Sequence, residues 1–419
     1  MGTLAVSAVL ATIVVWCVLA GRLQARGLTA PIVFVAAGWF FADVLGLLDL
    51  EVEPELVRVI AEVTLVWVLF ADASRVRLGQ LRRDLSTYAR LLGIGLPLTI
   101  AAGVGAAMIV LGFDLWAALL VAAALAPTDA ALGAPVMSNP HVPEKVRRAL
   151  NVESGLNDGI ATPIVLVAIA GVAADQGIIG VESPGGAVLS LLVGLVVGLV
   201  VGGLGGWITR LARERDWLSA ELAGPAVLAL ALLAYAAALT MDGNGFVAAF
   251  VGGLVFGNVA GPSGEKEVYF VSQSGDMAAM VSWLVFGALA VPVIQDQWDW
   301  TMLGYAVLSL TIVRMLPVAI ALLGTGFDRF SVAFVGWFGP RGLASVIFAL
   351  IALEDLHGAG ADAVAVISLT VLLSVLAHGL SAVPLAKRFA VTRPRSASPE
   401  LNQPSRQAEG DTPRGGRSR

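Results

Sequence analysis

Long apolar runs recur along the whole chain, and they restrict its fold more than any other feature. Of 419 residues, 58% are hydrophobic and only 14% are charged, against about 25% charged residues in a soluble domain. A helix needs roughly 20 apolar residues to cross a bilayer. We therefore predict an all-α polytopic membrane protein with about thirteen transmembrane helices, at approximately 3–20, 29–48, 55–73, 87–111, 115–135, 147–173, 185–209, 221–240, 244–259, 271–293, 300–324, 330–353 and 363–387.

The basic residues fall on one side of this alternation of spans and loops. With the N-terminus outside, all but three of the 26 Lys and Arg residues lie in inner loops or the tail, as the positive-inside rule requires. We predict an N-out, C-in protein of the inner (cytoplasmic) membrane. The first run has no basic flank before it and is expected to be a retained helix. Residues 391–419, rich in Arg, Ser, Pro and Gly, are predicted to be a disordered cytoplasmic tail.

Three arginines do not fit this loop assignment. Arg58 lies near the outer end of the third run, whereas Arg314 and Arg341 fall well inside the eleventh and twelfth. A guanidinium cannot lose its proton at that depth and is costly there unless it is paired. Their partners are expected among the few acids inside the runs.

The fifth run is interrupted at residues 126–135 by two prolines and a glycine. Proline removes a backbone donor and frees a carbonyl one turn earlier, and non-helical backbone at membrane depth must be buried in protein or line a wet cavity. Thr128 could offer oxygen ligands to a desolvated cation. Asp129 could neutralise a helix N-terminus; the alternative is a simple kink that Asp129 caps.

The sixth run carries four polar residues at helical spacing. Ser154 and Asp158 lie one turn apart on one face, and Glu153 and Asn157 form a similar pair on the adjoining face. Glu153 is the natural structural partner of an arginine. Asp158 lies deeper, and a buried acid can hold a proton near neutral pH and yield it to a cation. A satisfied polar network between helices is the alternative interpretation.

The twelfth run is broken like the fifth, at residues 338–345. If the seventh run is a linker, the two broken runs are the fifth members of two inverted halves. Broken helices at matching positions of inverted repeats indicate a secondary-transporter site near the bilayer midplane.

At these residues the chain resembles the cation:proton antiporter-1 family of NhaP-type sodium/proton exchangers. The resemblance covers most of residues 1–390. It depends on four segments, which are weak singly and specific together: Pro127-Thr128-Asp129, Glu153-Ser154-Gly155-Leu156-Asn157-Asp158, Arg314-Met315-Leu316-Pro317 and Gly339-Pro340-Arg341-Gly342.

The resemblance implies a NhaA-like fold with core helices at roughly 87–173 and 300–387 and dimerisation helices at roughly 3–73 and 221–293, hence a homodimer. It implies that Asp158 binds Na⁺ and H⁺ alternately, assisted by Ser154 and Thr128. Glu153 would pair with Arg314 as the first candidate and with Arg341 as the second. Asn157, where an electrogenic relative carries an aspartate, implies electroneutral 1:1 exchange. No cofactor is implied beyond the transported cation and protons.

Two positions depart from the family pattern or leave it ambiguous. Ala130 stands where the fifth-run motif often has proline. Asp72 either reaches the site, as an acid of the third span does in some members, or is an inner-loop acid paired with Arg75. We assign no role to His141 or to His378, which has no evident partner.

Other functions remain open at this point. A potassium/proton antiporter and an organic-anion symporter fit the same fold, because no linear motif fixes the number of ligands or the cavity size. A membrane hydrolase is poorly supported by a chain with three histidines. Nothing in the charge pattern resembles a nucleic-acid-binding surface.

Overall fold

The computed structural model describes residues 3–25, 28–48, 54–77, 79, 84–137, 139, 141–178, 183–261 and 264–392. Those residues form helices and connecting turns with no strand, so the all-helical prediction is confirmed. Eight of the described helical segments are long and apolar enough to cross a membrane, and three shorter apolar helices accompany them. Of the predicted tail, residues 391–392 end the last helix, and the rest lies outside the described residues.

Each predicted run corresponds to one helix or to two or three consecutive helical segments. In chain order these are α1 (Thr3–Ala25), α2 (Ala30–Trp39) with the π-helical turn η1 (Phe40–Val44), α3 (Pro54–Arg75), α5 (Leu85–Arg90) with η2 (Leu91–Gly95) and α6 (Leu96–Val110), α7 (Leu115–Ala124), α8 (Ala130–Met137), α9 (Glu144–Asp175), α10 (Pro184–Glu214), α11 (Ala220–Leu239), α12 (Gly245–Val259), α13 (Glu265–Asp296), α14 (Trp300–Leu308) with η4 (Ser309–Val313) and α15 (Arg314–Ala321), α16 (Arg329–Trp337), α17 (Leu343–Asp355) and α18 (Ala361–Thr392).

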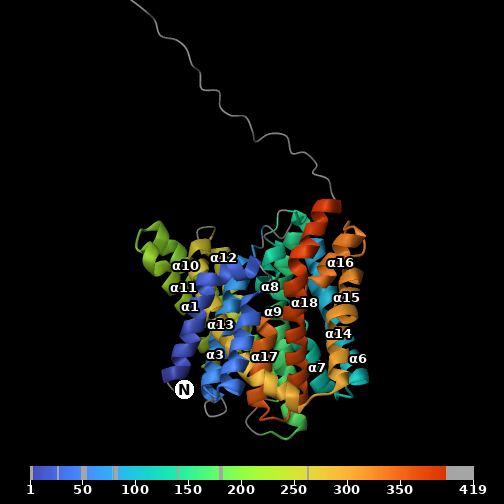
Figure 1. Cartoon of the computed structure of the whole chain (residues 1–419). Coiled ribbons are helices and arrows are strands. Elements are labelled where there is room, and N and C mark those ends of the chain that lie inside the picture. Colours follow the sequence, from blue (N-terminus) through green and yellow to red (C-terminus); the bar gives the residue numbers. More distant parts are fainter. Residues whose placement is uncertain are drawn as a thin grey trace, which may run out of the picture.

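The helices stand roughly side by side (Figure 1). In this view α1, α10 and α11 lie toward one side, and α6, α14, α15 and α16 toward the other. Helix α3 packs on α12 and α13, while α18 packs on α14 and α17. Contacts of α9 and α17 with α3 join the two sides, so the middle of the molecule is where the groups of helices meet.

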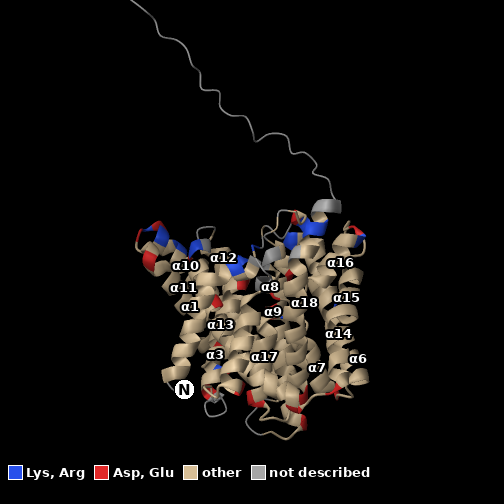
Figure 2. Cartoon of the chain, viewed as in Figure 1, with Lys and Arg blue, Asp and Glu red and all other residues tan. Residues whose placement is uncertain are grey.

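Charged residues collect at the two ends of the helices (Figure 2). The blue Lys and Arg residues gather at the end where α18 finishes, and the opposite end, where the chain starts, is mainly red with acids. The long middle zone is almost entirely tan. An apolar band between a basic and an acidic end is typical of a multi-pass membrane protein.

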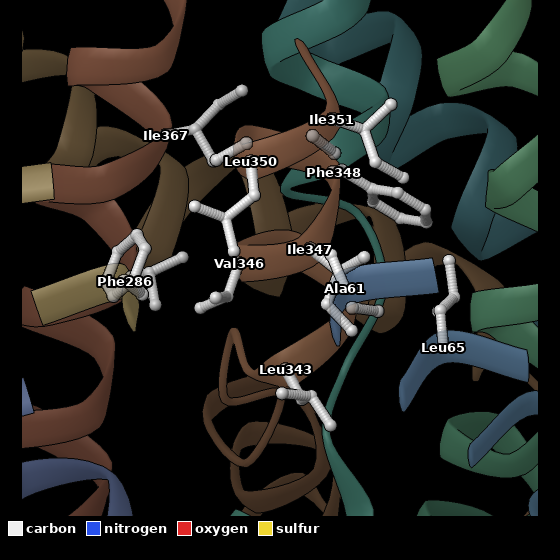
Figure 3. Packing of buried hydrophobic residues seen from close by; sticks show 14 of the residues in the cluster. Ala61, Leu65, Phe286, Leu343, Val346, Ile347, Phe348, Leu350, Ile351 and Ile367 are labelled. Carbon is white, nitrogen blue, oxygen red and sulfur yellow. The ribbon is translucent and has the colours of Figure 1, made fainter. Parts of the chain in front are cut away.

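Helix α17 forms the centre of the apolar core. Every residue from 343 to 352 is buried. Figure 3 shows α17 side chains such as Val346 and Phe348 among Leu65 of α3, Phe286 of α13 and Ile367 of α18. A helix that is apolar on all sides is suited to the interior of a bundle, so α17 is held by neighbours on every face.

Glycines allow α10 and α12 to approach closely. Gly194, Gly198 and Gly202 recur every four residues on one face of α10, and a Cβ at any of them would overlap the backbone that begins or forms α12. Small residues at this spacing are a common device for packing membrane helices. These three glycines thus allow the backbones of α10 and α12 to touch.

Candidate cation and proton site

Two helices are broken near the middle of the molecule. Residues 125–129 separate α7 from α8, and residues 338–342 separate α16 from α17. Pro127 and Pro340 have no backbone N–H to continue the helix, and each lies in one of these segments. Both breaks fall at the places where the sequence predicts them.

The two breaks contact each other through Asp129. Its backbone N–H donates to the Pro340 carbonyl at 2.9 Å. One carboxylate oxygen accepts from Leu132 N–H at 3.2 Å, and the other from Leu343 N–H at 2.9 Å. Asp129 therefore caps the N-termini of α8 and α17 together, so its negative charge lies at two positive helix ends. The sequence predicted the first cap and not the second.

Arg341 is fully buried within the second break. Its Nη1 lies 3.2 Å from the Ala126 carbonyl oxygen and 3.4 Å from that of Pro127. The Ser345 hydroxyl donates to the Ala124 carbonyl at 2.6 Å. Arg341, the second predicted partner of Glu153, thus contacts carbonyls freed by the first break instead.

Glu153 and Arg314 form a buried ion pair. The Arg314 Nη1 lies 2.7 Å from Glu153 Oε1, and the two side chains are only 2% and 3% exposed. Arg314 begins α15 directly after the π-helical turn η4. The structure therefore places the first predicted partner, Arg314, against Glu153.

Thr128 joins the first break to α9. Its hydroxyl accepts from Asn157 Nδ2 at 2.7 Å and lies 3.0 Å from the Ser154 hydroxyl. All three side chains are buried, and no hydrogen-bond partner is found for Asn157 Oδ1 among the described residues. The unwound segment and one face of α9 thus share a small cluster of oxygen atoms.

Asp158 lies one turn beyond Ser154 on α9 and is 9% exposed. Its Oδ1 is buried and has no hydrogen-bond partner within the described part of the chain. Its backbone carbonyl accepts from the Thr162 hydroxyl at 2.7 Å. Buried polar atoms normally have a partner, so an unmatched carboxylate oxygen here is suited to receive a proton or a cation.

The described side-chain contact of Asp72 matches one of the two interpretations left open by the sequence, the pairing with Arg75. Its Oδ1 lies 3.4 Å from Arg75 Nη1, which is the pairing expected of an inner-end acid. Asp72 lies in the last turn of α3, at the basic end of the molecule. That its side chain reaches the site of Asp158 stays a prediction.

Sequence reasoning missed His378. Both of its ring nitrogens have partners, one on Ser374 of its own helix and one on Trp337 at the end of α16. The prediction that His378 has no partner is wrong. The sequence does place a serine one turn before this histidine, which could have predicted the contact within α18. The second partner lies 41 residues away, and residue spacing within one helix cannot predict it.

Comparisons with known proteins agree with this arrangement. A family model described as "Sodium/hydrogen exchanger, transmembrane" matches residues 6–388. The K(+)/H(+) antiporter NhaP of Alkalimonas amylolytica is 26% identical over 363 residues, covering 84% of this chain and 61% of that protein. The Na(+)/H(+) antiporter NhaH of Halobacillus dabanensis is 28% identical over 298 residues, covering 68% and 71%. The chain thus spans about six tenths of the NhaP relative's length.

A solved structure shares the fold. The sodium proton antiporter MjNhaP1 from Methanocaldococcus jannaschii superposes with a TM-score of 0.77 at 19% identity, covering 93% of this chain and 98% of that one. The family match extends over nearly all of the helices described above. The chain therefore belongs to the sodium/hydrogen exchanger transmembrane family, and the resemblance to NhaP-type exchangers seen in its motifs is confirmed.

Proposed function

We propose that the chain is a secondary antiporter that exchanges one proton for one monovalent cation at Asp158. The observation that carries this proposal is the buried Asp158 Oδ1, which has no hydrogen-bond partner among the described residues and belongs to the helix that contacts the unwound segment. On the preceding turn of the same helix, Ser154 and Asn157 contact Thr128 of the unwound segment and contribute hard oxygen atoms. Such donors suit alkali cations better than soft metal ions.

The charges at the breaks support an exchange of one for one. Two positive charges, on Arg314 and Arg341, face three carboxylates. The carboxylates are those of Glu153, Asp129 and Asp158, so one negative charge is left over when Asp158 is ionised. One proton or one monovalent cation cancels that charge. A neutral site crosses a low-dielectric barrier far more easily than a bare carboxylate does, so the occupied states move and the empty state is held back.

The conformational change that carries the site across the membrane is a movement of the helices that contain the breaks. We assign α6–α9 and α14–α18 to a mobile core, and α1–α3 and α11–α13 to a dimerisation domain of a homodimer. We also propose thirteen spans with the N-terminus outside the inner membrane. The gathering of Lys and Arg at the end where α18 finishes supports this orientation (Figure 2).

We propose sodium as the cation and potassium as the second candidate. Both have support, because the similar curated proteins include a Na(+)/H(+) antiporter and several K(+)/H(+) antiporters. The two ions differ in size and therefore in the number of oxygens that they require. Addition of each ion in turn to one preparation of vesicles distinguishes them.

The direct test replaces Asp158 by Asn, which keeps the size of the side chain and removes its charge. In everted vesicles with a pH-sensitive dye, Asp158→Asn should abolish proton release on addition of Na⁺, K⁺ or Li⁺. Asp175→Asn is the matched control, since Asp175 is the exposed last residue of the same helix. Exchange at the wild-type rate in Asp158→Asn would overturn the proposal.

A further inference from the structure

A histidine of α18 lies inside the break between α16 and α17. His378 is 1% exposed, and its ring is 5.1 Å from the Trp337 ring, centroid to centroid. Its Nε2 lies 2.8 Å from the Trp337 carbonyl oxygen, and its Nδ1 lies 3.1 Å from the Ser374 hydroxyl. The same hydroxyl accepts the backbone N–H of Arg341 at 2.7 Å.

These contacts engage the two backbone groups that one helical hydrogen bond would otherwise join. In an unbroken helix the Trp337 carbonyl would accept the N–H of Arg341, four residues later. Here the carbonyl is turned to Gly339 N–H and to His378, while the Arg341 N–H donates to Ser374. Two side chains of α18 are therefore inserted where the helix would otherwise close, which is a recognised cause of a broken helix.

One tautomer of the neutral ring links all of these groups. With its hydrogen on Nε2, His378 donates to the Trp337 carbonyl, which only accepts. Nδ1 then accepts from the Ser374 hydroxyl, whose oxygen accepts from Arg341. Nδ1 also lies 2.8 Å from the Ser374 carbonyl oxygen. The ring, the Ser374 hydroxyl and the Arg341 N–H thus form one chain of hydrogen bonds from α18 to the break.

Residues 338–342, which His378 and Ser374 contact, form one wall of the proposed cation site. The Arg341 side chain contacts the carbonyls of Ala126 and Pro127, and the Pro340 carbonyl accepts from Asp129. Thr128 lies between these contacts along the chain. A shift of the 338–342 backbone would therefore move the hydroxyl that faces Ser154 and Asn157.

We infer that His378 and Ser374 are positioning residues that hold the α16–α17 break open and thereby set the geometry of the cation ligands at Thr128. This inference depends on the proposed exchange at Asp158. Neither residue touches the cation; both act through Arg341 and the backbone of the break. Their loss should therefore change how well each cation fits, beyond any change in the amount of active protein.

The test compares apparent KM values for Na⁺, Li⁺ and K⁺ in vesicles. His378→Leu and Ser374→Ala should each raise the KM of the preferred cation by about three- to tenfold and change the ratio of KM values between cations. His378→Gln, which can still donate to Trp337, and Ser374→Thr should recover most of the loss. The double variant His378→Leu/Ser374→Ala should be no worse than either single variant, because both break one chain of bonds.

Thr370→Val is the matched control, because this buried α18 hydroxyl bonds only the Val366 carbonyl of its own helix among the described contacts. If His378→Leu fails to fold, Ser374→Ala carries the test alone, since it removes a single oxygen atom. Unchanged KM values and ratios in Ser374→Ala, or a lower maximal rate alone, would overturn the inference. Absence of cation-driven proton movement in the wild type would instead reject the proposed function.

Discussion

Two carboxylates on α9 have opposite surroundings although they are little more than one turn apart. Glu153 is paired with a buried arginine at 2.7 Å, whereas Asp158 Oδ1 has no partner among the described residues. Low dielectric strengthens a complete ion pair and penalises an incomplete one. Arg314 therefore supplies a counter-ion to Glu153, whereas no described group supplies one to the Asp158 Oδ1 atom.

This contrast predicts that Glu153 matters for folding rather than for ion binding. Glu153→Gln leaves the Arg314 charge buried without a counter-ion, and breaking a buried pair typically costs about 3–5 kcal/mol. The amount of folded protein in the membrane, measured by fluorescence-detected size-exclusion chromatography, should fall sharply.

The paired replacement Glu153→Leu/Arg314→Met should restore folded protein, because an apolar pair of similar size needs no counter-ion. Normal abundance of Glu153→Gln would contradict the structural role of the pair. Failure of the double variant to improve on the single variant would show that the ion pair does more than neutralise charge.

At the scale of elements, the site depends on two broken helices that meet at Asp129. Its carboxylate caps α8 and α17, and the close approach is allowed by a glycine, since a Cβ on Gly342 would overlap the Asp129 carboxylate. Side chains of α18 separate the ends of the second break. Each break is thus stabilised by residues from other helices, as membrane-buried irregular backbone must be.

Gly342→Ala should therefore separate the two breaks. Loss of a cap costs about 0.5–2 kcal/mol, and forcing an extra methyl into a packed site costs typically about 1–3 kcal/mol more. Transport per folded molecule should fall at least about tenfold. The control is Gly304→Ala on α14, where no atom lies within 4 Å of an added Cβ. Equal transport in the two variants would show that the contact with Asp129 is dispensable.

Some of these elements are readable from the sequence and others are not. Hydropathy marks the apolar runs because each must match the thickness of a bilayer, and prolines mark the breaks because they lack an N–H. The second cap of Asp129 and the carbonyl partners of Arg341 lie more than 200 residues away along the chain. Only the packing of helices brings such partners together, so local spacing predicts the residues and not their contacts.

At the scale of the whole molecule, a cluster of ion pairs at the acidic end joins α3, of the proposed dimerisation domain, to α17, of the proposed core. Arg58 of α3 lies 3.2 Å from Asp355 and 3.7 Å from Glu354, both at the end of α17. It also pairs with Glu62, whose other oxygen accepts from the Tyr235 hydroxyl. If α17 moves relative to α3 during exchange, this link has to open.

Arg58→Gln should loosen the described conformation without preventing exchange. Exposed ion pairs are worth about 0.2–1 kcal/mol each, and Arg58 makes two with α17, so the balance between conformations should shift by no more than about thirtyfold. Amide hydrogen exchange should become faster near the end of α17. Arg210→Gln is the control, because that arginine pairs with Glu214 inside a single helix. Unchanged exchange at α17 would rule out a role as a link between α3 and α17.

The central claim is that one proton and one cation compete for Asp158. The most direct measurement is the apparent KM for the transported cation in vesicles at a series of pH values. As pH falls below the titration of the site, the KM should rise by about tenfold per pH unit, while the maximal rate at saturating cation changes little. A KM that stays constant with pH while the maximal rate falls would place the proton elsewhere and contradict a shared site.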